Sequence, residues 1–219
     1  MVQINMQERE ISLKVVYYGP ALSGKTTNLQ QIHSLIEAGT RGEMLTLDTA
    51  DDRTLYFDFL PVHFDIHNGF SVKIKLFTVP GQVMHKSTRK VVLSGADAVV
   101  FVVDSQASST TANSYSWRDM ESNLTANSID ADAIPKVIQL NKRDLPEAQP
   151  LEEYEAIWPG IQRIPAVANT GEGVIETFRA SLHGLYGSLN DEHRFGERFG
   201  LDEAQFVKSV LREFPRSNR

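Results

Sequence analysis

One eight-residue stretch constrains the fold of this chain more than any other. Residues 19–26, Gly-Pro-Ala-Leu-Ser-Gly-Lys-Thr, match the pattern G-x-x-x-x-G-K-[ST]. An apolar run typical of a buried strand (11–18) precedes the stretch, and a helical pattern from Lys25 to about Ala38 follows it. In that order, backbone N–H groups and the positive end of a helix converge on one point, where a phosphate binds. The stretch therefore predicts a phosphate-binding loop in an α/β protein.

The side chains of this loop have distinct expected roles. Lys25 is expected to reach the β- and γ-phosphates of a nucleotide, and the Thr26 hydroxyl to ligate magnesium. The residues expected to contact the nucleotide here are Gly19, Leu22, Ser23, Gly24, Lys25, Thr26 and Thr27.

The rest of the chain alternates short apolar runs with helical patterns. Further strands are expected at 62–66, 70–79, 98–103, 136–140 and 166–168, and helices at about 86–93, 112–126, 151–157 and 174–188. Asn68-Gly69 between the first two of these runs predicts a hairpin. The expected fold is a P-loop NTPase G domain. Its sheet is mostly parallel with one antiparallel edge strand, and helices cover both faces.

The composition changes after about residue 189, which divides the chain into a predicted G domain (1–189) and a C-terminal extension (190–219). The extension begins as a polar, glycine-broken segment that reads as a linker. Apolar residues then recur at helical spacing: Leu201, Ala204, Val207, Val210, Leu211 and Phe214. Three roles are open for this amphipathic helix: it packs on its own domain, it binds a partner helix, or it lies on a membrane surface. Its few basic residues argue against the membrane.

A second motif follows the run at 136–140. The carboxyl ends of strands in open α/β sheets carry ligand sites, and Asn141-Lys142-Arg143-Asp144 stands at such an end. The Asp144 carboxylate can accept from N1–H and the 2-amino group of guanine, whereas adenine offers neither donor. Asn141 and Lys142 are expected to frame the base. Ala168 and Asn169, at the end of the last predicted strand, are expected to offer a backbone N–H to the guanine O6.

Two further segments suggest hydrolysis. In Thr78-Val79-Pro80-Gly81-Gln82, the Gly81 N–H can meet the γ-phosphate and Gln82 can orient the attacking water. Thr54 is a candidate second hydroxyl ligand for magnesium, and Arg53 can place a guanidinium on the charge of the transition state. The expected catalytic residues are therefore Gln82, Arg53 and Lys25, and the expected metal ligands are Thr26 and Thr54.

Composition excludes several other functions. The net charge of −6 and the absence of a basic block argue against nucleic acid as a partner. The chain has no cysteine, which excludes disulfides, thiolate metal sites and a cysteine nucleophile. The start lacks the apolar core of a signal peptide, and Val2 and the final FPRSNR fit neither myristoylation nor prenylation. A cytoplasmic protein without a lipid anchor is expected.

Taken in order, GPALSGKT, Thr54, PGQ, NKRD and VAN resemble the Ras superfamily over roughly residues 11–188. Longer segments resemble one branch of it, the bacterial mutual-gliding-motility A (MglA-like) family of GTPases. These segments are KVVYYGPALSGKTTNLQ, RTLYFDFLP, KLFTVPGQV, VVFVVDSQ and VIQLNKRDLP.

The resemblance implies a small GTPase that uses GTP, GDP and Mg²⁺ and controls cell polarity or motility machinery. It also implies a slow intrinsic rate and a Roadblock-domain protein as the activating partner. That partner donates no arginine, because the catalytic arginine of the family lies in its own switch I and is matched here by Arg53. Thr78 agrees with the family, which has Thr where most Ras-like proteins have Asp. Effectors are expected to bind the switch loops near 40–60 and 81–95.

Ala21 departs from the glycine common at its position, and its methyl group is expected to slow hydrolysis. This departure keeps open an alternative from another class, a nucleotide-locked scaffold that binds GTP with negligible hydrolysis. A P-loop ATPase or metabolite kinase is the third alternative, and NKRD argues against it.

Overall fold

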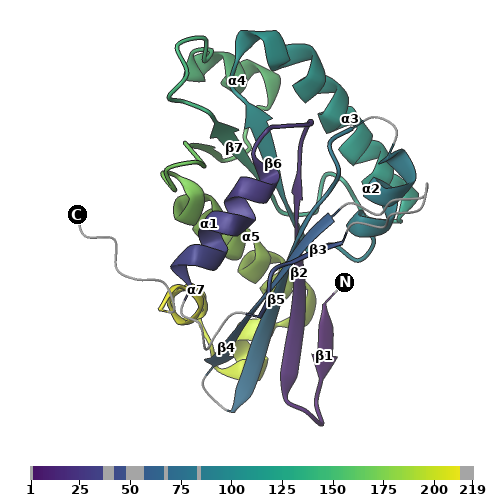
Figure 1. Ribbon diagram of the computed structural model, residues 1–219. Helices are drawn as coiled ribbons and strands as arrows, with labels where there is room; N and C mark the ends of the chain where they lie inside the picture. The colour runs from purple at the N-terminus through teal and green to yellow at the C-terminus, as the bar shows by residue number, and fades with distance from the viewer. Residues whose placement is uncertain (1, 37–41, 48–56, 67–68, 83–84, 213–219) are drawn as a thin grey trace.

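The computed structural model describes residues 2–36, 42–47, 57–66, 69–82 and 85–212, which form a central sheet covered by helices (Figure 1). The strands are β1 (Gln3–Asn5), β2 (Glu10–Tyr18), β3 (Leu45–Leu47), β4 (Phe57–Ile66), β5 (Phe70–Thr78), β6 (Ala98–Asp104), β7 (Lys136–Asn141) and β8 (Arg163–Pro165). The helices are α1 (Lys25–Leu35), α2 (Lys86–Leu93), α3 (Thr110–Ala126), α4 (Leu151–Ile157), α5 (Val174–His193), α6 (Phe195–Phe199) and α7 (Glu203–Leu211), with a 3₁₀ turn, η2, at Ala107–Ser109.

The sheet has the strand order β3-β4-β5-β2-β6-β7-β8. Strands β5, β2, β6, β7 and β8 run parallel, whereas β4 is antiparallel to β5 and β3 is antiparallel to β4. β1 pairs antiparallel with the start of β2. The predicted mostly parallel α/β class is confirmed, with β1 and β3 as two short strands that periodicity did not reveal.

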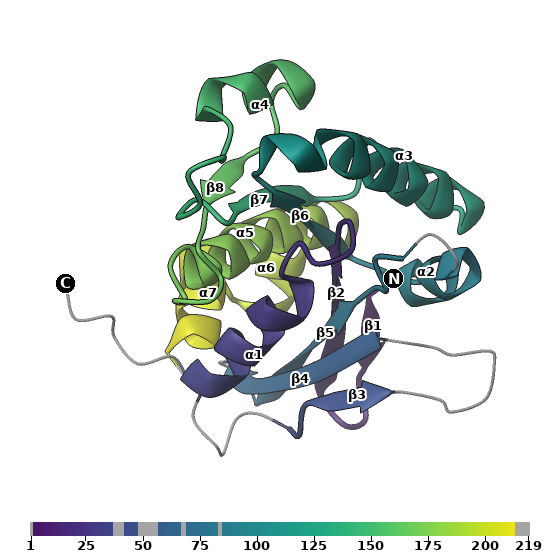
Figure 2. The ribbon, with the colours of Figure 1, turned by 45° about the horizontal axis from the view of Figure 1, so that its top comes forward.

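Helices cover both faces of the sheet (Figure 2), and a separate apolar core lies beneath the helices on each face. Strand β2 feeds both, because Val15 and Tyr17 join the core under α1, α5 and α7, while Val16 and Tyr18 join the core under α2 and α3. A strand covered on both faces reads as a continuous apolar run, which is why β2 and β6 were visible in the sequence.

Some element boundaries differ from prediction. Strand β4 begins at Phe57 and not at 62, because Pro61 and the polar Asp58 interrupt the apolar pattern although both residues pair with neighbouring strands. β8 occupies 163–165, and the predicted strand at 166–168 is instead a loop. α5 continues to His193, through the position where the domain boundary was predicted.

The segment expected to be a linker is helical and packs against β5 and α5. Phe195 and Phe199 of α6 are buried, and the Phe199 ring meets Phe70 of β5 at a centroid distance of 4.9 Å. In α7 the buried face contains Phe206, whose ring lies 6.1 Å from that of Phe64 on β4. Ala204, predicted to belong to this face, is exposed. In the part of the chain that the structure describes, no helix has the length and apolar character needed to cross a bilayer.

Candidate nucleotide-binding site

The loop between β2 and α1 wraps as its sequence predicts. Gly24 takes a left-handed conformation (φ 101°) at the start of α1 and caps the helix without a side-chain hydrogen bond. The first-turn amides of α1 are therefore not satisfied by a capping side chain, which is the arrangement that binds anions. Leu22 is also left-handed (φ 61°) and is 88% exposed. The buried Ser23 hydroxyl has no hydrogen-bond partner among the described residues.

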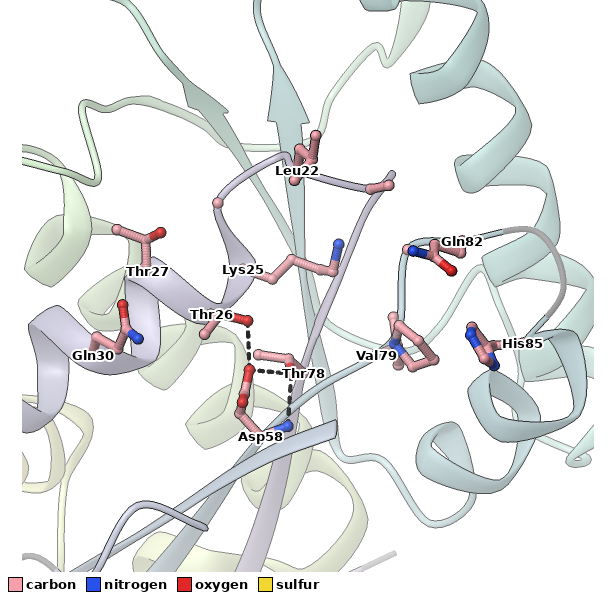
Figure 3. Close-up of a pocket in the computed structure, with 14 residues that line it drawn as sticks. Leu22, Lys25, Thr26, Thr27, Gln30, Asp58, Thr78, Val79, Gln82 and His85 are labelled. Atoms are coloured by element: carbon pink, nitrogen blue, oxygen red, sulfur yellow. Dashed lines mark hydrogen bonds between the residues drawn. The ribbon is translucent and has the colours of Figure 1, made fainter. Parts of the chain in front are cut away.

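Lys25 extends from the first turn of α1 back beneath this loop (Figure 3). Its ammonium donates to the carbonyl oxygens of Gly19 at 2.9 Å and Pro20 at 2.6 Å. Burial, together with the positive charge of Arg89, lowers the pKa of Lys25 to about 7, and Asp58 opposes this shift. An anion bound in the loop would oppose this shift, because nearby negative charge favours the protonated ammonium and raises the pKa of Lys25.

The loop forms one wall of a cavity of about 980 Å³. Its lining residues are Ala21, Leu22, Gly24, Lys25, Thr26, Thr27, Gln30, Asp58, Thr78, Val79, Pro80, Gly81, Gln82 and His85. The cavity thus joins the predicted phosphate loop to the predicted hydrolysis segment, which lie more than fifty residues apart in sequence.

A hydroxyl–carboxylate cluster occupies the floor of this cavity (Figure 3). The Thr26 hydroxyl donates to Asp58 Oδ2 at 2.5 Å, and the Thr78 hydroxyl donates to the same oxygen at 2.9 Å. The Asp58 N–H in turn donates to the Thr78 hydroxyl at 2.9 Å. Hydroxyl and carboxylate oxygens are the ligands and supports that Mg²⁺ prefers, so this cluster fits a divalent cation beside a phosphate.

Asp58 is a site residue that sequence reasoning missed. Asp58 is buried on β4, and the pairing of β4 with β5 brings it next to Thr78. Thr78 is the residue at the position where most Ras-like proteins have Asp. A signal was available: Thr78 leaves the predicted metal site short of a carboxylate, and Asp58 interrupts the apolar run FDFLP.

The segment after β5 lies directly against the phosphate loop. A methyl group placed on Gly81 would lie 2.3 Å from Ala21 N and 2.4 Å from Ala21 Cα, so only glycine permits this approach. Gln82 is exposed at the cavity edge. Arg53 and Thr54 lie outside the described residues.

The NKRD motif lies on the other side of the same loop. The Asn141 side chain donates to Ser23 O at 2.7 Å and accepts from Ala168 N at 2.8 Å. It thereby ties the phosphate loop to the loop after β8. Gly24 leaves room for this contact, since a methyl group there would lie 2.2 Å from Asn141 Nδ2. This contact places the Ala168 amide, a predicted donor to the base, next to the NKRD motif.

Two neighbours complete this side of the site. Lys142, in a left-handed conformation (φ 64°), pairs with the buried Asp104 at the end of β6 at 2.7 Å. Asp144 is exposed at the motif's end, and Asn169 follows Ala168 with its carbonyl bonded to Gln31 at 3.0 Å.

Comparison with known proteins agrees with this geometry. A scan against models of protein families found no match. Among curated proteins, the mutual gliding-motility protein MglA of Myxococcus xanthus (strain DK1622) is 48% identical to this chain over 179 residues. The match covers 81% of this chain and 92% of the relative. With this identity over most of both lengths, and with a P-loop, a PGQ segment and an NKRD motif at one edge of the sheet, the chain belongs to the MglA family of small GTPases.

Proposed function

We propose that this protein is a molecular switch that binds GTP or GDP with Mg²⁺ and hydrolyses GTP slowly by itself. The observation that carries the proposal is the double hydrogen bond of Asn141, which joins the phosphate loop to the NKRD motif and the Ala168 loop. One ligand with a phosphate chain and a guanine base would contact all three segments.

The proposed binding residues follow from this placement. Residues 1–189 act as the G domain and 190–219 as an extension, whose described part, up to residue 212, packs against β4, β5 and α5. The phosphates are bound by Gly19, Leu22, Ser23, Gly24, Lys25, Thr26, Thr27 and Gly81, and the base by Asn141, Lys142, Asp144, Ala168 and Asn169.

Hydrolysis relies on positioning and electrostatic stabilisation. Mg²⁺ held by the Thr26 and Thr54 hydroxyls would neutralise charge on the β- and γ-phosphate oxygens. Asp58 orients Thr26, Lys25 stabilises the charge of the γ-phosphoryl group, and Gln82 orients the attacking water. Arg53 supplies a second cation in the transition state.

We propose that the switch controls motility machinery or cell polarity, and the name of the relative supports a role in gliding motility. We propose a Roadblock-domain protein as the activating partner, with effectors bound at the switch loops. Because Arg53 is in this chain, the partner needs only to order it. Arg53→Ala should keep nucleotide affinity and lose the stimulation, which is about 10³–10⁵ in rate where an arginine is supplied. Unchanged stimulated phosphate release would refute this role.

The contact between Ala21 and Gly81 favours a second candidate, a scaffold locked by its nucleotide. Ala21 places a methyl group on the loop against which Gly81 packs. If that methyl group excludes the geometry that hydrolysis needs, GTP persists. Single-turnover phosphate release from a GTP-loaded sample, with and without partner, separates the two candidates.

Titration calorimetry tests the proposal itself. Nucleotide-free protein in Mg²⁺ buffer should bind GDP tightly and ATP not at all. Comparable ATP binding would contradict the guanine assignment.

A further inference from the structure

A buried polar network lies between α2, α3 and the end of β2, outside the cavity. Arg89 of α2 pairs with Asp119 of α3 through Nε and Oδ2 at 2.7 Å, and both side chains are almost fully buried. The Tyr18 hydroxyl donates to the same carboxylate at 2.5 Å, and Asn123 Nδ2 donates to it at 3.0 Å. Burial and the bond to Asp119 raise the pKa of the Tyr18 phenol, so its hydroxyl remains a donor.

The other end of the Arg89 guanidinium reaches the segment that carries Gln82. Its Nη1 donates to Gln82 O at 2.5 Å and to Pro80 O at 3.4 Å. The Gln82 carbonyl also accepts from the His85 amide at 3.2 Å. One planar cation thus joins a carboxylate on α3 to two carbonyls of the loop at the cavity edge.

This arrangement is more than packing requires. Burial of two charges is costly, and apolar side chains of similar volume are often as stable as a buried ion pair. What the pair adds is direction, because the guanidinium has fixed donor geometry and its carboxylate partner is held by two further donors. Tyr18 also immediately precedes Gly19, so the network links the strand entering the phosphate loop to the Gln82 loop.

We propose that Arg89 is a positioning residue for GTP hydrolysis: anchored by Asp119, it fixes the backbone of residues 80–82 so that the Gln82 side chain meets the attacking water. This inference rests on the proposed function. Arg89 contacts neither nucleotide nor water in this role and acts through Gln82.

The test replaces the ion pair by apolar side chains. In R89M/D119L no buried charge is left unpaired, so the protein should fold, whereas either single variant strands a charge. Single-turnover hydrolysis of GTP by the purified full chain with Mg²⁺ should slow about ten- to hundredfold, since a misplacement of about 1 Å can cost about a hundredfold. The Kd for GDP should change less than about twofold.

A comparison with Gln82 separates positioning from general stability. Gln82→Ala should slow hydrolysis by a similar factor, and adding R89M/D119L to it should produce no further loss. Arg163→Met is the matched control, because Arg163 also bonds a carbonyl, Trp158 O at 2.7 Å, and an acid, Glu155, but at the far edge of the sheet. Its hydrolysis rate should match wild type.

Three results would overturn the inference. An unchanged rate in R89M/D119L beside a slowed Gln82→Ala would remove the role of Arg89 and leave the proposed function intact. If the rate losses of R89M/D119L and Gln82→Ala multiply in the variant that combines them, Arg89 does not act through Gln82. Tyr18→Phe, which keeps the ion pair, should slow hydrolysis less than R89M/D119L, and a larger loss would place the effect in the phosphate-loop strand. If the wild-type protein binds GDP but does not hydrolyse GTP, the proposed hydrolytic function itself is refuted.

Discussion

The two halves of the candidate site are held together by different interactions. The half proposed to bind the base is joined by Asn141, whose neutral amide bonds backbone groups of Ser23 and Ala168 at 2.7 and 2.8 Å. The half proposed to bind and cleave the γ-phosphate is held by charge: Asp58 accepts from two hydroxyls, and Arg89 joins Asp119 to the Gln82 loop. The first half lies at the ends of parallel strands, and the second draws on side chains from β4, α2 and α3.

The difference predicts that nucleotide affinity and hydrolysis rate can be changed separately in this protein. The Asn141 bonds to two loops and the ion pair of Lys142 with Asp104 preform the base half, because the sheet fixes the positions of the strands β6 and β7 that carry them. Charged contacts in the other half depend on elements that meet only through the fold. Variants of the base half should therefore change affinity, and variants of the γ-phosphate half should change metal dependence or rate.

The largest expected effect is in the base half. Asp144→Ala would remove the two proposed charge-assisted hydrogen bonds to guanine, each contributing about 1.5–3 kcal/mol, so GDP affinity should fall at least about a hundredfold. Titration with a fluorescent GDP measures the Kd. Glu147→Ala, an exposed acid three residues away, is the control and should bind GDP as wild type does. Equal affinity of both variants would remove Asp144 from the site.

Asp58→Asn should break the other half while sparing the first. The Mg²⁺ concentration for half-maximal hydrolysis should rise about tenfold or more, because residues that orient metal ligands typically contribute 10–100-fold to metal affinity. GDP affinity measured in chelator should stay the same. Asp65→Asn, an exposed position on the same strand, is the control. A lower GDP affinity without Mg²⁺ would show that the halves are coupled through Asp58.

The lowered pKa of Lys25 predicts that both folding stability and GDP binding depend on pH. Its pKa of about 7 in the ligand-free protein lies below the ordinary 10.5, chiefly through burial. Between these values the unfolded chain binds a proton that the native state lacks, so the stability of the ligand-free protein should rise with pH in this window and be lowest below pH 7. Bound phosphates raise the pKa, so at pH 8 GDP binding should take up close to one proton.

Calorimetry in two buffers of different ionisation enthalpy measures that uptake. The uptake should vanish near pH 6, where Lys25 is already protonated, and Lys25→Met should abolish it at pH 8. Persistent uptake in Lys25→Met would assign the proton to another group.

The smallest expected effect is a change in hydrolysis rate at the contact between Gly81 and Ala21 of the phosphate loop. Ala21→Gly should speed single-turnover hydrolysis about threefold, a change of less than about 1 kcal/mol in the barrier. The gain should disappear in a Gln82→Ala background, because the Ala21 methyl group is proposed to slow hydrolysis by limiting the space available to the Gln82 side chain. Equal rates for Ala21→Gly and wild type would leave Ala21 without a role in the rate.

Much of the fold was predictable because its signals are local. The continuous apolar runs of β2, β6 and β7 indicated strands covered on both faces, and the carboxyl ends of parallel strands share one edge. The phosphate loop and NKRD each follow such a strand, which places both at this edge. The short strands β1 and β3 lack such a signal, since three residues are too few for periodicity. The glycines and charges around Phe195 and Phe199 concealed α6, whose two rings become apolar anchors only when β5 and α5 are beside them.

The sequence by itself determined the phosphate loop and the NKRD motif, because each is a contiguous segment whose backbone geometry follows from its own residues. It also determined the α/β class, because strand and helix patterns alternate along the chain. Only the tertiary structure decided that Asp58 supports Thr26 across 32 residues and that Arg89 meets Asp119 across 30. Both pairs join a polar side chain on one element to a partner on another. The position of such a pair depends on strand order and helix packing, which no local pattern encodes. The cost of burying a charge then makes each contact specific once the fold has formed.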